Sequence, residues 1–314
     1  MSALCAGGCA VTEPGDAGTH PSSGAQDLDD TEVGYLRVLR TEHGTASYEG
    51  CTATLISPVV LLTAAHCMPR PGSTDTFDGF YTGPGAPSGA NVLPHNLTWH
   101  GITEFAIYPG DSYHPGSYDY ARDPARCPAQ HVDLAVVRLA QPIHGAPTYG
   151  WQHLAAAFQG APCTMIGYGY HSGAMGQKDR TPLSVRSTPD AGWYTAPRST
   201  GLVAWWDPGN ASNHGIPDDG DSGGPLICAT QRGPVIAGVV SCASSEVDVR
   251  APRGTFTGAP IFEAAGEGPS VWIEYYWCTW SGYLCRVDAA SDARSRAART
   301  AVDATIESRR KWPG

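Results

Sequence analysis

Residues 219–226 read DGDSGGPL, a stretch that sets one serine, Ser222, among three glycines and two acids. A serine crowded by glycines has two ordinary explanations. It can lie in a surface turn that requires positive φ, or it can be a nucleophile whose backbone must come close to a substrate. Surface turns are the more common case. A nucleophile also needs a histidine to accept the hydroxyl proton and a carboxylate to orient that histidine.

The composition predicts a mostly β protein. The chain has 314 residues, enough for one large β domain or two moderate lobes. With 38 Gly, 26 Pro and only 16% charged residues, it favours many short strands joined by turns. Short β-branched runs bounded by Gly, Pro and Ser read as strands; they cover residues 33–40, 51–57, 59–66, 133–139, 163–170 and 235–242.

Three segments differ in composition. Residues 1–30 are small, polar and acidic, so we expect a leader remnant or propeptide that does not order by itself. Residues 31–280 form the expected main domain. Residues 281–314 form a C-terminal extension, and its Ala- and Arg-rich part predicts a helix over residues 287–310.

Charge and cysteine content narrow the partners and the compartment. A net charge of −10 gives no electrostatic reason to bind nucleic acid or an anionic membrane. The sequence contains no run of 18 apolar residues, so no transmembrane helix is predicted. Ten cysteines without zinc-site spacing favour disulfides and a secreted, extracellular or periplasmic protein. Lipid attachment at Cys9 is disfavoured, because Ala6 stands where a large aliphatic residue is expected.

A candidate base and a candidate acid precede the serine in the chain. The strand-like run LISPVVLLTAAHC (55–67) ends at His66, which places an imidazole at the mouth of a loop. The run HVDLAVVRL (131–139) sets Asp133 at the head of an apolar strand, where a carboxylate needs hydrogen bonds to be buried. An imidazole N–H would satisfy it. Taken singly, either motif also fits a structural role, as a buried histidine beside a disulfide or as a strand cap.

Together, TAAHC, the Asp-Leu-Ala strand and GDSGGPL, in the order His66, Asp133, Ser222, resemble the chymotrypsin-like (trypsin-family) serine proteases. The resemblance runs from about residue 33 to residue 280. It implies two packed six-stranded antiparallel β-barrels with the catalytic residues between them, and it implies a protein or peptide substrate. We expect no cofactor and no metal, and a monomer is favoured.

The same serine also fits GxSxG, the nucleophile elbow of α/β-hydrolases. That fold places its catalytic histidine after the serine. The eleven histidines of this chain end at His214, and none follows Ser222. Chain order therefore excludes the elbow. A metal-dependent hydrolase has little support because HExxH spacing is absent. The alternative that stays open is a catalytically silent, protease-like binding protein.

The resemblance assigns a role to each residue of the motifs. His66 is the general base, Asp133 holds its tautomer, and Ser222 attacks the peptide carbonyl. The N–H groups of Gly220 and Ser222 form the oxyanion hole. Asp221 orders the oxyanion loop by pairing with a cation. Because no IVGG-like segment precedes residue 33, that cation is either an α-amine or another group.

The resemblance also predicts two disulfides and a specificity pocket. Cys51 pairs with Cys67, and Cys163 pairs with Cys228. The pocket floor maps to Ile216 and its wall to the segment Ser241, Cys242 and Ala243. An apolar floor predicts cleavage after uncharged, apolar residues. For the other cysteines, Cys278 with Cys285 and Cys127 with Cys242 are possible pairs, and Cys5 and Cys9 belong to the leader.

Overall fold

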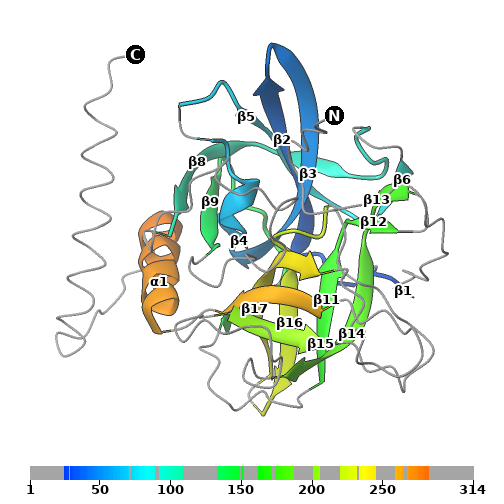
Figure 1. The fold of residues 1–314 in the computed structure, drawn as a ribbon. Coiled ribbons are helices and arrows are strands. Elements are labelled where there is room, and N and C mark those ends of the chain that lie inside the picture. Colours follow the sequence, from blue (N-terminus) through cyan, green and yellow to red (C-terminus); the bar gives the residue numbers. More distant parts are fainter. Residues whose placement is uncertain are drawn as a thin grey trace.

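The protein is described from a computed structural model, which is mostly β (Figure 1). The residues described are 25–27, 29–70, 72–88, 92–108, 133–148, 150–151, 162–171, 174–186, 201–205, 220–231, 233–244, 259–264 and 267–282. Most strands belong to two antiparallel sheets, one from each half of the chain. Within the described residues, no helix is long and apolar enough to span a membrane.

The N-terminal sheet has seven antiparallel strands in the order β7-β5-β2-β3-β4-β9-β8. Their bounds are β2 (Val33–Glu42), β3 (Thr45–Ser57), β4 (Val60–Thr63), β5 (Thr76–Thr82), β7 (Thr98–His100), β8 (Ile102–Ile107) and β9 (Ala135–Leu139). The sheet curls so that β5 and β8 approach each other: the rings of Phe77 and Phe105 meet edge to face, 5.4 Å apart. Six neighbouring strands of this sheet, β5-β2-β3-β4-β9-β8, therefore form the first barrel, and the short β7 is added at the β5 edge.

The C-terminal sheet contains a closed ring of six strands. The order β14-β11-β16-β17-β18-β15 returns to its start because β14 also pairs with β15, and every pair in the ring is antiparallel. Their bounds are β11 (Pro162–Gly167), β14 (Asp179–Arg186), β15 (Gly201–Trp205), β16 (Pro225–Thr230), β17 (Gly233–Ser244) and β18 (Ala259–Ala264). The expected double-barrel fold is confirmed.

Short strands join these barrels at their margins. β10 (Gly150–Trp151) pairs parallel to β17, and β12 (Tyr170–His171), β13 (Ala174–Gln177) and β6 (Gly85–Ser88) form a small antiparallel sheet. β6 lies between β5 and β7 in the first half of the chain, whereas β12 and β13 belong to the second half. This small sheet therefore links the two halves of the chain beside the barrels.

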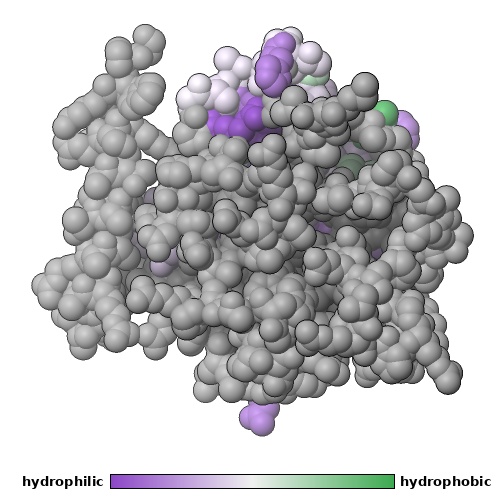
Figure 2. All heavy atoms as spheres, in the orientation of Figure 1, coloured by the Kyte–Doolittle hydropathy of each residue, from purple (hydrophilic) through white to green (hydrophobic). Residues whose placement is uncertain are grey.

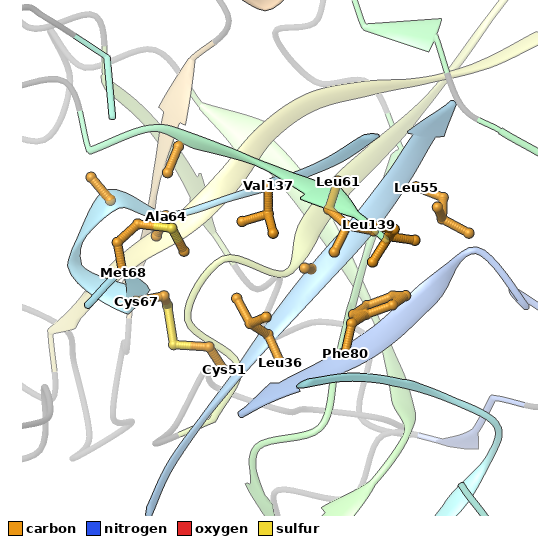
Figure 3. Close-up of a cluster of buried hydrophobic side chains, with 13 residues drawn as sticks. Leu36, Cys51, Leu55, Leu61, Ala64, Cys67, Met68, Phe80, Val137 and Leu139 are labelled. Carbon is orange, nitrogen blue, oxygen red and sulfur yellow. A yellow bond between two sulfur atoms is a disulfide. The ribbon is translucent and has the colours of Figure 1, made fainter. Parts of the chain in front are cut away.

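Strand β3 is buried on both faces over its second half, Cys51–Ser57. Side chains alternate across a strand, so the two faces contact different neighbours. Cys51 and Leu55 belong to the core of the first barrel (Figure 3), whereas Ile56, on the other face, packs with Trp272 of helix α1 (Glu267–Ser281). Thr52, on the same face as Ile56, lies against the second barrel. β3 thus has no solvent-facing side over this stretch.

The two barrels share an apolar contact. Val33, Tyr35 and Tyr81 of the first barrel pack with buried residues of the second half, which are Ile166, Tyr168 and Ile227. The Tyr168 hydroxyl donates to the backbone carbonyls of Val33 and Gly83. Burial of these side chains removes apolar surface from water and stabilises the packed pair of barrels. The candidate site lies along the same interface.

Helix α1 covers the first barrel although its chain segment follows the second. It packs against β3, β4 and β9, with Trp272 and Ile273 fully buried. Trp272, Tyr276 and Trp280 recur every four residues, and their rings contact in succession with centroids 5.1 and 4.6 Å apart. The sequence pattern did not predict this helix, because aromatic residues favour strands over helices. The helix expected over residues 287–310 lies outside the described residues.

Several described residues that precede β2 pack against the second barrel. β1 (Ala25–Gln26) pairs with β14, and Asp27 is buried. The buried Lys178 lies 3.8 Å from Asp27 Oδ2, and its Nζ donates to the Asp30 carbonyl over 2.6 Å. Burial raises the pKa of Asp27 and lowers the pKa of Lys178. The segment expected to end at residue 30 therefore includes residues that join the fold, and residues 1–24 lie outside the described residues.

The described surface is hydrophilic where the β2–β3 hairpin ends. Figure 2 shows polar residues gathered over this part of the molecule, and residues 43–47 at the hairpin are exposed. His43 and Gly44 take positive φ angles of 50° and 80° there. The hairpin turn thus faces solvent, while the buried half of β3 runs toward the candidate site.

Candidate active site

His66 lies in a single 3₁₀ turn, Ala65–Cys67, directly after β4 ends at Thr63. The adjacent Cys67 is fully buried and joined to Cys51 of β3 by a disulfide with a Cα–Cα distance of 6.2 Å. This bond fixes the turn to the barrel wall on one side of the imidazole. The His66 side chain itself stays 17% exposed.

Asp133 precedes β9 and is 1% exposed. Its Oδ1 accepts the backbone N–H of His66 over 2.8 Å, and its Oδ2 lies 2.7 Å from His66 Nδ1. Oδ2 also accepts the hydroxyl of Ser241 over 2.7 Å. A buried carboxylate is stable when hydrogen bonds replace its lost hydration, and these three bonds do so. They fix both the position of the imidazole and the nitrogen that carries its proton.

The pKa values of this pair move in opposite directions. Burial disfavours the imidazolium, but the charge of Asp133 and its hydrogen bond to the ring outweigh that effect and raise the pKa of His66. Burial also disfavours the carboxylate, yet the charge of His66 and the hydrogen bonds from His66 and Ser241 lower the pKa of Asp133. Asp133 therefore stays ionised and supports a proton on His66.

Ser222 lies in the turn that leads into β16. Gly220 and Gly223 take φ angles of 97° and 80° there, a region that side chains with a Cβ rarely adopt. A Cβ at Gly223 would also lie 2.1 Å from Thr63 Oγ1. Backbone bonds fix the turn: Thr52 N–H donates to the Ser222 carbonyl over 2.8 Å, and Gly223 N–H donates to the Val240 carbonyl over 2.7 Å. The glycines thus permit close packing of the turn against both barrels.

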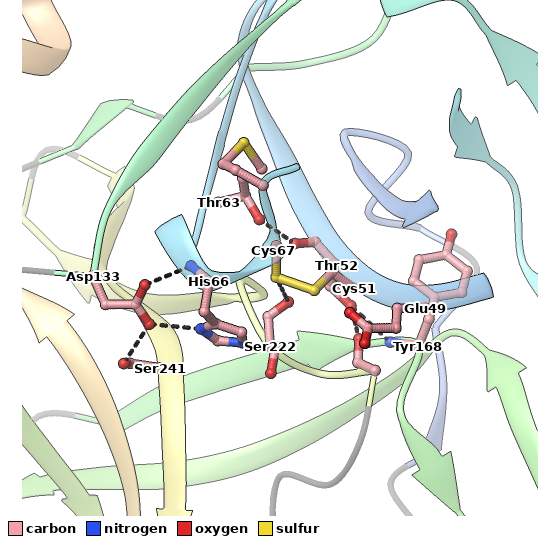
Figure 4. The surroundings of a disulfide bond; sticks show 12 residues. Glu49, Cys51, Thr52, Thr63, His66, Cys67, Asp133, Tyr168, Ser222 and Ser241 are labelled. Atoms are coloured by element: carbon pink, nitrogen blue, oxygen red, sulfur yellow. Dashed lines mark hydrogen bonds and ion pairs between the residues drawn. A yellow bond between two sulfur atoms is a disulfide. The ribbon is translucent and has the colours of Figure 1, made fainter. Parts of the chain in front are cut away.

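The three side chains lie in sequence across the barrel interface. Figure 4 shows Asp133 on one side of the His66 ring and Ser222 beside its opposite edge. The three residues come from distant parts of the chain: the turn after β4, the segment that leads into β9 and the turn before β16. The structure thus brings close together the three residues that the sequence motifs indicated as candidates, His66, Asp133 and Ser222.

A comparison with protein-family models agrees with this geometry. The model described as Trypsin matches residues 29–262, most of the chain. The chain belongs to the trypsin family. The match to the family model begins at Asp29, shortly after β1, the short strand that pairs with β14. A search of curated proteins found no match.

Asp221 is fully buried in this trypsin-family site. Its Oδ1 accepts the N–H of Gly169 over 2.7 Å. A Cβ at Gly169 would lie 2.3 Å from the Asp221 carboxylate, and a Cβ at Gly167 would lie 2.0 Å from it. The two glycines therefore make room for the carboxylate. Asp221 is separate from the Asp133 carboxylate that contacts the imidazole.

The residues expected to form the trypsin-family specificity pocket are only partly described. Ile216, the expected floor, lies outside the described residues. Ser241, Cys242 and Ala243 lie on β17, where Cys242 pairs with Ile261 and Ala243 with Pro260 of β18. The buried Ser241 directs its hydroxyl at Asp133. The family resemblance predicts only a place in the pocket wall for Ser241; this contact was not predicted, because chain position alone does not show where a hydroxyl points.

Both disulfides predicted from the family resemblance are confirmed. Besides Cys51–Cys67, Cys163 of β11 is bonded to Cys228 of β16, with a Cα–Cα distance of 4.1 Å. Cys278 of α1 is also disulfide-bonded, and the partner expected for it, Cys285, lies outside the described residues. Cys5, Cys9 and Cys127 lie outside them as well.

One cluster of metal-binding residue types occurs in the described part of the chain. Donor atoms of Cys51, His66 and Cys67 lie within 4.8 Å of one another. Both sulfur atoms belong to the disulfide, so neither is a thiolate, the form of cysteine that binds metals. The cluster is therefore explained by the disulfide beside the imidazole.

Proposed function

We propose that this trypsin-family protein is an active serine endopeptidase that uses Ser222, His66 and Asp133. The observation that carries the proposal is the 2.7 Å contact between His66 Nδ1 and Asp133 Oδ2, with Ser222 beside the far edge of the ring. A proton on Nδ1 leaves Nε2 free to accept one from a hydroxyl. The family supplies the class of reaction, and the geometry supports these residues as the reacting groups.

In acylation, the bond between Ser222 Oγ and the carbonyl carbon forms, the peptide C–N bond breaks, and one proton passes from the serine to the leaving amine by way of His66. As Ser222 Oγ bonds to the peptide carbonyl carbon, its proton passes to His66 Nε2. The carbonyl oxygen becomes an oxyanion, to which the N–H groups of Gly220 and Ser222 donate in our proposal. The C–N bond then breaks, and His66 returns the proton to the leaving amine. One oxyanion donor contributes roughly 100- to 1000-fold in rate.

Deacylation repeats these steps with water in place of the amine. Water attacks the acyl carbon while His66 accepts its proton, and that proton returns to Ser222 Oγ as the ester bond breaks. Through both halves, Asp133 stays ionised and stabilises the imidazolium that forms. The low pKa of Asp133 and the raised pKa of His66 favour this division of roles.

Hydrolysis of a peptide library by matched variants tests the proposal. Ser222→Ala should lower kcat by roughly a millionfold, and His66→Ala by a similar factor, because the residues act as a unit. Ser73→Ala is a control that removes an exposed serine hydroxyl, which donates to the Arg70 carbonyl and accepts the Asp75 N–H, and it should keep full activity. A protein that folds but cleaves no peptide would instead favour the silent binding protein.

We further propose cleavage after uncharged, apolar residues, on the basis of Ile216 at the mapped pocket floor. A carboxylate there would attract Lys or Arg side chains, whereas an aliphatic floor does not. The substrate preference of Ile216→Asp, measured as kcat/KM on peptides that differ at one position, should shift toward basic residues. An unchanged preference would place the floor elsewhere.

We also propose that the protein works outside the reducing cytosol. Cys51–Cys67 and Cys163–Cys228 both lie within the folded barrels, and disulfides of this kind persist in oxidising compartments. Thiol titration of the protein isolated from its native compartment should find these four cysteines unreactive until the protein is unfolded and reduced. Free thiols at these positions would contradict the assignment.

A further inference from the structure

Thr52 connects the first barrel to the turn that carries Ser222. It follows Cys51 on β3, is fully buried, and its side chain lies at the face of the second barrel. Its Oγ1 donates to the Gly220 carbonyl over 2.8 Å and accepts the backbone N–H of Tyr168 over 3.1 Å. Figure 4 shows Thr52 between the disulfide and Tyr168. One hydroxyl therefore joins three segments that are distant in the chain.

The backbone of Thr52 is bonded as well. Its N–H donates to the Ser222 carbonyl over 2.8 Å, and its carbonyl accepts the hydroxyl of Thr63 over 2.8 Å. The N–H, the carbonyl and the hydroxyl of Thr52 are thus all hydrogen-bonded, the hydroxyl both as donor and as acceptor. A residue held at four points in a buried strand is a rigid support for whatever it contacts. Two of its four hydrogen bonds go to the turn that carries Ser222, namely to the carbonyls of Gly220 and Ser222.

Gly220 is the part of the turn that needs this support. It has no Cβ and takes a φ of 97°, so local sterics restrict its backbone less than that of other residues. A bond to its carbonyl fixes the peptide that follows its Cα. The N–H of the same residue is one of the two proposed oxyanion donors, and such donors act only when already aimed at the oxyanion.

We propose that Thr52 is a positioning residue that holds the Gly220 and Ser222 peptides in the orientation that binds the oxyanion. The inference rests on the proposed function, because it assigns Thr52 a role in that same reaction. Thr52 touches neither substrate nor reacting atoms. Its effect passes through the Gly220 carbonyl, so loss of the hydroxyl should weaken binding of the transition state more than binding of the substrate.

Neighbouring Thr54 offers a matched control. It lies two residues further along β3, is equally buried, and its Oγ1 has no hydrogen-bond partner among the described residues. Thr→Val is nearly isosteric at both positions. At Thr52 it removes a donor and an acceptor that are in use and leaves the Gly220 carbonyl and Tyr168 N–H buried without this partner. At Thr54 it removes a hydroxyl that makes no hydrogen bond.

The experiment compares Thr52→Val, Thr52→Ser and Thr54→Val, with active sites titrated so that only folded enzyme is counted. Thr52→Val should lower kcat roughly 10- to 100-fold, with KM within about twofold. Its affinity for a peptide aldehyde, which forms a tetrahedral adduct with the serine, should fall by the same factor as kcat. Thr52→Ser, which keeps the hydroxyl, should recover most of kcat, and Thr54→Val should match the unchanged protein.

Two results would overturn the inference: a kcat for Thr52→Val equal to that of Thr54→Val, or a Thr52→Ser variant as impaired as Thr52→Val. If Thr52→Val does not fold, Thr52→Ala removes the same hydroxyl without adding a methyl group and takes its place, with the same expected split between kcat and KM. Failure of the proposed function looks different, because the unchanged protein and Thr54→Val would then also cleave no peptide.

Discussion

Arg40 donates a hydrogen bond from Nη2 to the backbone carbonyl of His66 over 2.9 Å. The same guanidinium donates to the Met68 carbonyl over 2.6 Å, so it binds the chain on both sides of Cys67. Arg40 lies on β2, is 5% exposed, and forms ion pairs with Asp75 and Glu49. A buried cation of the barrel wall thus holds the turn that carries the imidazole.

We expect Arg40→Met to reduce both stability and the pH range of activity. Loss of one partner from a buried ion pair costs about 3 kcal/mol in the free energy of unfolding. The Arg40 charge lowers the pKa of His66, so its removal should raise that pKa further and move the acid limb of the kcat/KM profile to higher pH. Urea unfolding and a pH profile measure the two effects. An acid limb that stays in place would show that Arg40 does not act on the imidazole.

Asp133→Asn should shift the acid limb in the opposite direction. The Asp133 carboxylate raises the pKa of His66, so an amide there lets the imidazole lose its proton at lower pH. The activity at the plateau should nevertheless fall by roughly 10⁴-fold, because the amide no longer selects the correct tautomer or stabilises the cation. The kcat/KM profile between pH 5 and about 9 reports both changes. A rise in the apparent pKa would contradict the pairing.

We expect removal of either disulfide to lower stability, but removal of Cys51–Cys67 to lower kcat more than removal of Cys163–Cys228. Removing Cys51–Cys67, which closes a 16-residue interval, should lower the free energy of unfolding by about 3 kcal/mol. Removing Cys163–Cys228, with a 65-residue interval, should lower it by about 4 kcal/mol. The first bond lies beside His66, so its double Cys→Ala variant should lose the larger share of kcat per folded molecule. Equal losses of kcat would show that the first disulfide has no special relation to the imidazole.

Gly169→Ala should displace Asp221. The added Cβ would lie 2.3 Å from the Asp221 carboxyl carbon, so the carboxylate or the β11–β12 connection has to move. We expect kcat to fall at least tenfold, because the adjacent Gly220 and Ser222 would move with Asp221. Gly101→Ala, in the first barrel, meets only side-chain atoms, with the Trp99 ring at 3.1 Å and the Ala140 Cβ at 3.4 Å, and serves as the control. Equal kcat values for the two variants would show that the turn tolerates displacement of Asp221.

The sequence predicted the parts of the site that local patterns encode. TAAHC, the Asp-Leu-Ala strand and GDSGGPL each place a candidate catalytic residue next to a strand end or a glycine turn, and the structure brings the three together. The two disulfides followed from the family resemblance at matched positions. A motif of a few residues contains the information needed for such short-range placement.

Long-range supports were not predicted, because no local pattern marks them. Thr52 and Arg40 resemble ordinary strand residues, and their roles depend on partners 168 and 26 residues away. Ser241 was assigned to the pocket wall, whereas its hydroxyl contacts Asp133. Helix α1 was missed because aromatic residues carry a weak helical preference, and its stability comes from packing on the first barrel.

Reaction with a phosphonyl fluoride, followed by peptide mapping of the adduct, tests whether His66 activates the Ser222 hydroxyl. The reagent phosphonylates a serine hydroxyl that has been activated by a neighbouring base. We predict a single adduct at Ser222 that forms as fast as inhibition develops, and no adduct in His66→Ala. Absence of labelling at Ser222 in the folded protein, or labelling that persists unchanged in His66→Ala, would contradict the account.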